Sequence, residues 1–98
     1  MKTRLSPAAL HDIEEVLQFL SMRSTSAASG FRNRFSEMRR LLGEYPYGGR
    51  LTDQDGLRYL NTDPYPYLIF YELIDGEVMI LRIMHGARDP RSMPGRPR

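Results

Sequence analysis

The chain has 98 residues, of which 41% are hydrophobic and 27% are charged, ordinary proportions for a soluble globular protein. This length makes one domain with a single core. The absence of cysteine excludes disulfide bonds and thiolate metal sites. No apolar run approaches the ~20 residues that a membrane span needs, and the N-terminus lacks a signal-peptide pattern, so we expect a cytoplasmic protein.

The formal net charge is only +2, but almost all of the positively charged side chains are arginines. Lys2 is the only lysine, so the other cations among the 14 are all arginines. The planar guanidinium suits carboxylates and phosphates, and it tolerates partial burial better than an ammonium does. The bias therefore fits an acidic protein partner or a nucleic acid. A G+C-rich genome that favours arginine codons explains it equally well.

The first half of the chain predicts a short strand and two helices. Residues 2–5 are predicted to form an edge strand. Ser6 is placed to cap a helix that has Pro7 at its first position and ends near Met22. Its apolar residues recur at steps of three and four, which is typical of an amphipathic helix: Leu10, Ile13, Leu17 and Leu20.

The second helix begins after Ser24-Thr25-Ser26, which can cap it. Its apolar residues again step by four, three and four along one face: Phe31, Phe35, Met38 and Leu42. Gly43 is a natural C-terminal stop. Because the connection between the helices is short, we expect them to form an antiparallel pair.

The second half of the chain predicts a loop, a short strand and a hairpin. Residues 45–56 are rich in proline and glycine and indicate a loop, and residues 57–60 indicate a strand. Asp75-Gly76 then separates two apolar runs, residues 67–74 and 77–84, a strong hairpin signal. With these two residues as the loop, the facing pairs are Leu73 with Val78, Tyr71 with Ile80, Ile69 with Arg82 and Tyr67 with Met84.

Both faces of this hairpin are mainly apolar, whereas antiparallel hairpins with one wet face alternate apolar and polar residues. The face opposite Tyr67 and Ile69 is predicted to carry Leu68, Phe70, Ile74, Met79, Leu81 and Ile83. We therefore expect the hairpin to be covered on both sides. The helices supply one cover, and a second polypeptide is expected to supply the other. Residues 91–98 form a basic tail that we expect to be mobile.

The predicted order is β-α-α-β-β-β, an α+β fold with a helical hairpin on one face of a small, mainly antiparallel sheet. Residues 1–90 form the domain and residues 91–98 the tail. Five segments of the domain together resemble the ParE branch of the RelE/ParE toxin superfamily, in the expected order over residues 3–90. They are Leu5-Ser6-Pro7-Ala8-Ala9, the loop end Gly49-Arg50, Gly56-Leu57-Arg58, the strand 67–71 and Ile80-Leu81-Arg82-Ile83-Met84-His85-Gly86-Ala87-Arg88-Asp89.

This resemblance implies the toxin of a type II toxin–antitoxin pair, neutralised by an acidic antitoxin that folds onto it. ParE-like members poison DNA gyrase, whereas RelE-like members cut messenger RNA on the ribosome. RelE-like nucleases place an arginine where this chain has Leu68, and they commonly carry lysines and a late tyrosine or histidine. This chain has no lysine after Lys2 and no tyrosine after Tyr71. These departures favour the gyrase-binding branch.

Each role has its candidate residues. Target binding is expected at Arg82, His85, Arg88 and Asp89, and antitoxin binding at Tyr67, Ile69, Tyr71 and Ile80. The alternative, a ribosome-dependent ribonuclease, would use Arg58, Arg82, His85 and Arg88, which we expect to cluster near one strand end. Such a reaction needs a base, cations for the phosphate and an acid for the leaving oxygen. A third hypothesis is a degenerate toxin that only binds a partner.

Each candidate also has a structural interpretation. His85 can simply close a strand, and Arg82 can form a salt bridge with Asp89 or a helix carboxylate. Arg88 and Asp89 can pair with each other and anchor the tail. Three tyrosines can stack on bases or pack in the core, namely Tyr65, Tyr67 and Tyr71, and His11 is expected on a solvated face. We expect no metal and no cofactor, since two histidines without cysteine make a poor zinc site.

Overall fold

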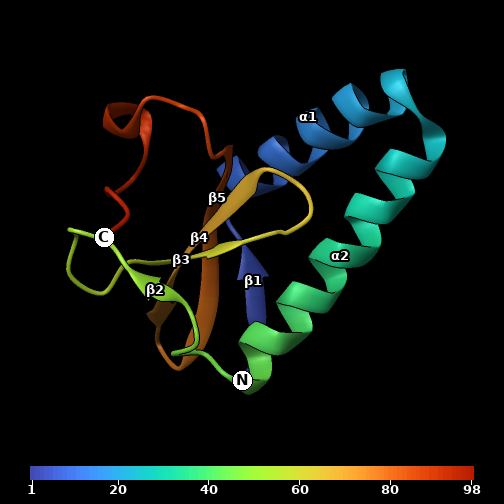
Figure 1. Ribbon diagram of the computed structural model, residues 1–98. Coiled ribbons are helices and arrows are strands. Elements are labelled where there is room, and N and C mark those ends of the chain that lie inside the picture. The colour runs from blue at the N-terminus through green and yellow to red at the C-terminus, as the bar shows by residue number, and fades with distance from the viewer.

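The computed structural model describes all 98 residues. Two helices pack on one face of a five-stranded sheet whose strand order is β1-β5-β4-β3-β2 (Figure 1). Strand β1 runs parallel to β5, and the other neighbouring pairs are antiparallel. The expected α+β class and element order are thereby confirmed. The elements are β1 Thr3–Leu5, α1 Pro7–Arg23, α2 Thr25–Glu44, β2 Arg50–Leu51, β3 Arg58–Asn61, β4 Tyr67–Ile74, β5 Glu77–His85 and the short 3-10 helix η1 Pro90–Ser92.

Both helices begin at the serines that the sequence indicates. The Ser6 side chain accepts a hydrogen bond from the Ala9 backbone N–H, and Ser24 does the same for Ala27, so each satisfies an N–H that the first helical turn leaves unpaired. Helix α2 ends at Glu44, one residue past the expected stop at Gly43. No helix of this chain combines the length and the apolar character that crossing a membrane requires.

The apolar stripe of α1 is rotated from the one that the sequence analysis chose. The helix buries Ala9, Asp12, Val16 and Leu20, which also recur at steps of three and four. Ile13 and Leu17 are half-buried, and Leu10 is exposed. The rotation brings a carboxylate, that of Asp12, to the sheet. Strand β2 is a second difference, because it lies in the segment expected to be a loop and pairs with β3.

The hairpin keeps the predicted register only next to its turn. Leu73 faces Val78 and Tyr71 faces Ile80, as expected, but a β-bulge at Phe70/Tyr71 then shifts the register. Beyond it Ile69 faces Ile83 and Tyr67 faces His85, so the predicted pairs with Arg82 and Met84 are wrong. The bulge admits one extra residue on β5, which also turns Ile83 to the face opposite the one predicted.

The main core lies between the helices and the sheet. Its strand residues share one face of β4 and β5, and aromatic rings from α2 pack against them, as where Phe31 meets Tyr67 edge-on at 5.3 Å between ring centroids. The cluster comprises Ala9, Val16, Leu20, Ala28, Phe31, Phe35, Met38, Leu42, Tyr67, Ile69, Tyr71, Val78, Ile80 and Ile83.

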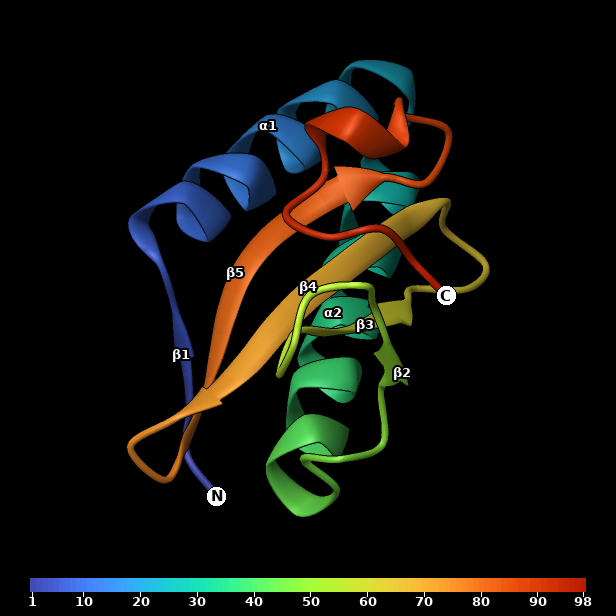
Figure 2. The ribbon, with the colours of Figure 1, turned by 90° about the vertical axis from the view of Figure 1, so that its left-hand side faces the viewer.

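The second face of the sheet carries its own apolar cluster, which the chain covers with its tail. In Figure 2 the tail, drawn in red, passes in front of the sheet while α2 lies behind it. Met93 and Leu81 pack against five buried residues there, namely Leu57, Tyr59, Leu68, Phe70 and Met84. The expectation that this face needs a second polypeptide is therefore wrong, because residues of the same chain lie against it. The mobility of the tail stays a prediction.

The end of the tail also pairs with the sheet edge. The Asp53 N–H donates to the Arg96 carbonyl at 2.9 Å, and the Arg98 N–H donates to the Leu51 carbonyl at 3.2 Å. Between them Thr52 and Pro97 form an antiparallel bridge. Strand β2 is thereby not left as a bare edge, whose unpaired backbone groups would invite pairing with other chains.

Candidate functional site

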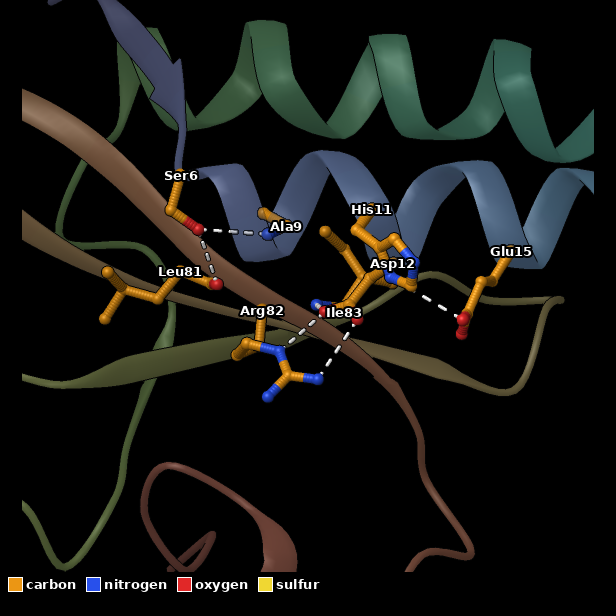
Figure 3. Close-up of polar contacts among 8 residues, drawn as sticks. All are labelled: Ser6, Ala9, His11, Asp12, Glu15, Leu81, Arg82 and Ile83. Carbon is orange, nitrogen blue, oxygen red and sulfur yellow. Dashed lines mark hydrogen bonds and ion pairs between the residues drawn. The ribbon is translucent and has the colours of Figure 1, made fainter.

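The edge of β5 beyond Ile80 has no strand beside it, because β1 ends at Leu5. Helix α1 runs along this edge instead and supplies polar groups in place of a strand (Figure 3). The Ser6 hydroxyl donates to the Leu81 carbonyl at 2.8 Å, and an Asp12 carboxylate oxygen accepts from the Ile83 N–H at 3.0 Å. Backbone groups that a missing strand would leave unpaired are thus satisfied by the side chains of Ser6, which caps α1, and of Asp12 within α1.

Arg82 is held by the same carboxylate. Its Nε lies 2.7 Å from Asp12 Oδ2 and its Nη2 lies 3.1 Å from Oδ1, a bidentate arrangement (Figure 3). Asp12 is buried, whereas the Arg82 side chain is 38% exposed. Hydrogen bonding to Asp12 raises the pKa of Arg82 above its ordinary value. The alternative that paired Arg82 with a helix carboxylate is therefore confirmed, and pairing with Asp89 is wrong.

His85 closes β5 and is exposed. Its Nδ1 accepts a hydrogen bond from the Ala87 N–H at 3.0 Å, and its ring meets the Tyr67 ring edge-on at 5.5 Å between centroids. His85 would have to break the bond to Ala87 before Nδ1 could accept a proton from a substrate.

The turn after β5 carries the remaining target candidates. Asp89 caps η1 and accepts hydrogen bonds from the Arg91 side chain and backbone, which hold the pKa of Asp89 below its usual range. The expected pairing of Arg88 with Asp89 is thus replaced by a pair with Arg91. Arg88 itself is exposed and has no carboxylate partner. His85, Arg88 and Asp89 are therefore exposed at the end of β5 and on the turn after it, whereas Arg82 lies within β5 and contacts Asp12 of α1.

Arg58 lies away from these residues. It is opposite Tyr71, whereas His85 is opposite Tyr67 four residues along β4, a separation of about 13 Å along the strand. Its Nη1 donates to the Gly49 carbonyl at 2.9 Å and the Tyr47 carbonyl at 3.2 Å. The expectation that the four ribonuclease candidates cluster near one strand end is therefore wrong.

The four residues predicted to bind an antitoxin lie in the main core. Tyr67, Ile69, Tyr71 and Ile80 are all buried beneath the two helices. A partner cannot contact side chains that the helices already cover, so the expectation of an exposed face at these positions is wrong. Alternation along a strand shows which residues share a face, but it does not show which of two apolar faces the helices will cover.

The buried tyrosines are anchored rather than free to stack on bases. The Tyr71 hydroxyl donates to the Pro46 carbonyl at 2.9 Å and accepts from the Gly49 N–H at 2.8 Å, which ties the loop before β2 to β4. Burial raises the pKa of Tyr71 and of Tyr67, although nearby arginines act in the opposite direction. Tyr65 is half-buried and packs against Phe31. Core packing is thereby confirmed for these three residues.

Asp12 and Ser6 are the polar residues whose role at β5 the sequence analysis missed. A signal was present for Asp12, since it falls at the right step from Ala9 to share the buried face of α1. His11, by contrast, is exposed as expected and faces Glu15 at 3.5 Å. No group of three or more histidine, aspartate or glutamate side chains is placed to hold a metal ion.

Comparison with known proteins identifies the class to which this architecture belongs. A family model described as the ParE toxin of the type II toxin–antitoxin system parDE matches residues 3–90. The chain is thus a toxin of the type II toxin–antitoxin class. Within that class it belongs to the ParE toxin family, and the matched residues stop short of the tail at 91–98.

One relative is also named as a toxin, and one solved structure shares the fold. The chain is 39% identical over 80 residues to Toxin RelE2 of Caulobacter vibrioides, an alignment that covers 82% of this chain and 89% of the relative. It also superimposes on a chain from a structure of the chromosomal ParDE TA system from P. aeruginosa with a TM-score of 0.74. That match has 19% sequence identity and covers 87% of this chain and 95% of the other, so it supports the fold.

Proposed function

We propose that this toxin inhibits DNA gyrase by binding it and that a cognate antitoxin, encoded with it, neutralises it. Family membership over residues 3–90 carries this proposal. The proposed target contacts are Arg82, His85, Arg88 and Asp89, of which the last three are exposed at the end of β5 and on the turn that follows it. The name of the structural neighbour, a ParDE TA system, supports an antitoxin as the partner.

The arrangement of cations supports binding over catalysis. Arg82 is already paired with Asp12, and the Nδ1 of His85 accepts a hydrogen bond from the Ala87 backbone N–H. Arg58 lies away from both residues and donates to two backbone carbonyls. Ribonuclease chemistry needs a base and phosphate-binding cations around one reacting group. A binding surface needs only that Arg88 and its neighbours be accessible, which they are.

A supercoiling assay with purified gyrase and purified toxin tests the proposal. We expect the toxin to reduce gyrase-dependent supercoiling of relaxed plasmid, and addition of the antitoxin to restore it. Gyrase that supercoils normally in a large molar excess of folded toxin would contradict the proposed target. Unrelieved inhibition in the presence of the antitoxin would contradict the proposed neutralisation.

A second candidate function is a ribosome-dependent ribonuclease, and the name of the relative Toxin RelE2 favours keeping it. Its candidate residues are Arg58, Arg82, His85 and Arg88. Primer extension on cellular transcripts after induction of the toxin distinguishes it from gyrase inhibition. Cuts phased with codons support the ribonuclease, whereas intact transcripts together with lost supercoiling support the gyrase poison.

A further inference from the structure

An apolar groove lies between the C-terminal half of α2, the loop that follows α2, and β3. Its volume is about 190 Å³, and apart from Gly48 it is lined by hydrophobic side chains: Met38, Leu41, Leu42, Tyr45 and Leu60. The α2 residues form one wall and Leu60 of β3 forms the other. We call this the β3 groove. Its volume is below the roughly 300 Å³ at which small-molecule pockets begin, so it fits one bulky side chain better than a free ligand.

Large exposed side chains neighbour the β3 groove in the chain or in the sheet, and together with Arg58 we call them its rim: Tyr45, Tyr47 and Leu51. Tyr45 is 64% exposed, Tyr47 is 69% exposed and Leu51 is 45% exposed. Leu51 lies opposite Arg58 in the sheet, and Arg58 shares its face of β3 with Leu60. Aromatic residues, methionine and arginine are the types enriched at the cores of protein interfaces, so this surface has the composition of a protein-binding site.

Arg58 gives the rim a positive charge that no carboxylate of this chain neutralises through an ion pair. Its guanidinium donates to the Tyr47 and Gly49 carbonyls and lies 5.4 Å from the centre of the Tyr47 ring. It has no carboxylate partner, and Glu44 at the end of α2 is already paired with Arg40. The half-buried charge therefore favours a partner that brings its own carboxylate. A second copy of this chain docked symmetrically here would instead bring two Arg58 side chains together.

We propose that the β3 groove and its rim are a docking surface for the antitoxin, which inserts one bulky apolar side chain into the groove and places a carboxylate on Arg58. This inference rests on the proposed neutralisation by an antitoxin and names the surface that it uses. The β3 groove and its rim thus take the place of the buried residues of β4 and β5 as the proposed site of antitoxin contact. An apolar anchor in a pocket, surrounded by a polar rim, is the arrangement that dominates the energy of protein interfaces.

Tyr45→Asp tests the inference, because Tyr45 forms part of the groove and its exposed side chain can change without disturbing the core. The probe is the purified protein encoded by the reading frame next to the toxin gene, titrated into the toxin by calorimetry. We expect the substitution to weaken binding by about 30-fold or more, since loss of an interface hot spot has that effect. Tyr45→Phe keeps the ring and should bind like the wild type.

Phe19→Asp is the matched control, because Phe19 is a similarly exposed aromatic residue on α1. It should leave binding unchanged, and the unfolding midpoints of all three variants should match that of the wild type. If Tyr45→Asp binds the antitoxin as tightly as the wild type does, the inference is overturned while the proposed function stands. If the wild-type toxin does not bind the neighbouring protein, the proposed neutralisation fails and the inference fails with it.

Discussion

Asp12 joins α1 to the sheet through three hydrogen bonds, two from the Arg82 side chain and one from the Ile83 backbone. We expect Asp12→Ala to lower the free energy of unfolding by about 2–3 kcal/mol, because it leaves an N–H and a guanidinium without their partner. The partial exposure of Arg82 keeps the loss below that of a fully buried ion pair. Urea denaturation followed by circular dichroism measures the change.

Glu15→Ala is the control for this prediction. Glu15 is exposed on the same helix and faces only His11, so its removal should change the free energy of unfolding by less than about 0.5 kcal/mol. Equal losses in the two variants would show that the Asp12 bonds contribute little, contrary to the structure.

Tyr71 has a buried hydroxyl, and it makes stability depend on alkaline pH. Burial raises the pKa of Tyr71 in the folded protein above its ordinary value of 10.0, so the unfolded chain loses this proton first. Stability is therefore complete below about pH 10 and falls as the pH rises further. We expect Tyr71→Phe to cost about 1–3 kcal/mol near neutral pH, because the Gly49 N–H and Pro46 carbonyl lose their partner.

The same variant should show a shallower alkaline fall in the free energy of unfolding than the wild type shows. Some fall remains, because burial also raises the pKa of Tyr67. Denaturation at about pH 8 and about pH 10.5 provides the comparison. Identical alkaline losses in wild type and Tyr71→Phe would contradict a role for this hydroxyl.

The packing of the tail depends on a small residue, Gly95. A Cβ added at Gly95 would lie 2.6 Å from Leu57 Cδ2 and 2.8 Å from Thr52 Oγ1, closer than real Cβ contacts. We expect Gly95→Ala to lift the tail, expose the apolar cluster beneath Met93 and increase the binding of a dye specific for apolar surface. The dye fluorescence should rise severalfold under native conditions.

Gly86→Ala provides the comparison, because a Cβ there meets nothing closer than 3.6 Å from the Pro66 carbonyl oxygen. It should leave dye binding unchanged. If Gly95→Ala also leaves it unchanged, the close approach of Gly95 to Leu57 and Thr52 does not hold the tail on the sheet. A rise in dye binding would support the packed tail of the structure over the mobile tail predicted from the sequence.

Elements set by local interactions were predictable, and those set by distant ones were not. Ser6, Pro7 and Ser24 act within one helical turn, and the Asp75-Gly76 turn fixes the first pairs of the hairpin, so the sequence reveals them. The bulge at Phe70/Tyr71 changes the register where α1 passes β5, a contact between residues about 70 apart in the chain. Periodicity within either strand carries no sign of it.

The same limit applies to the candidate site at the scale of the whole molecule. The motif that ends in Arg88 and Asp89 was visible in the sequence, and the structure places that turn on the surface. Which apolar face the helices cover, and which carboxylate pairs with Arg82, depend on how the layers assemble. Tyr67 and Ile80 were consequently assigned to a surface although they belong to the core.

Arg88 offers the sharpest test of the target-binding turn, because the whole fold holds it at the end of the sheet without engaging its side chain. We expect Arg88→Ala to raise the toxin concentration needed for half-inhibition of gyrase supercoiling by about tenfold or more, as loss of an interfacial arginine does. Its free energy of unfolding should stay within about 0.5 kcal/mol of the wild-type value, since the side chain makes no ion pair.

Arg32→Ala is the matched control, an exposed arginine on α2 that likewise has no carboxylate partner. It removes the same charge and should leave inhibition unchanged, which separates contact at the turn from a general effect of net charge. Arg82→Ala cannot replace Arg88→Ala in this test, because it also breaks the Asp12 pair and so mixes stability with binding. Equal inhibition by wild type and Arg88→Ala would remove this turn from the proposed gyrase contact.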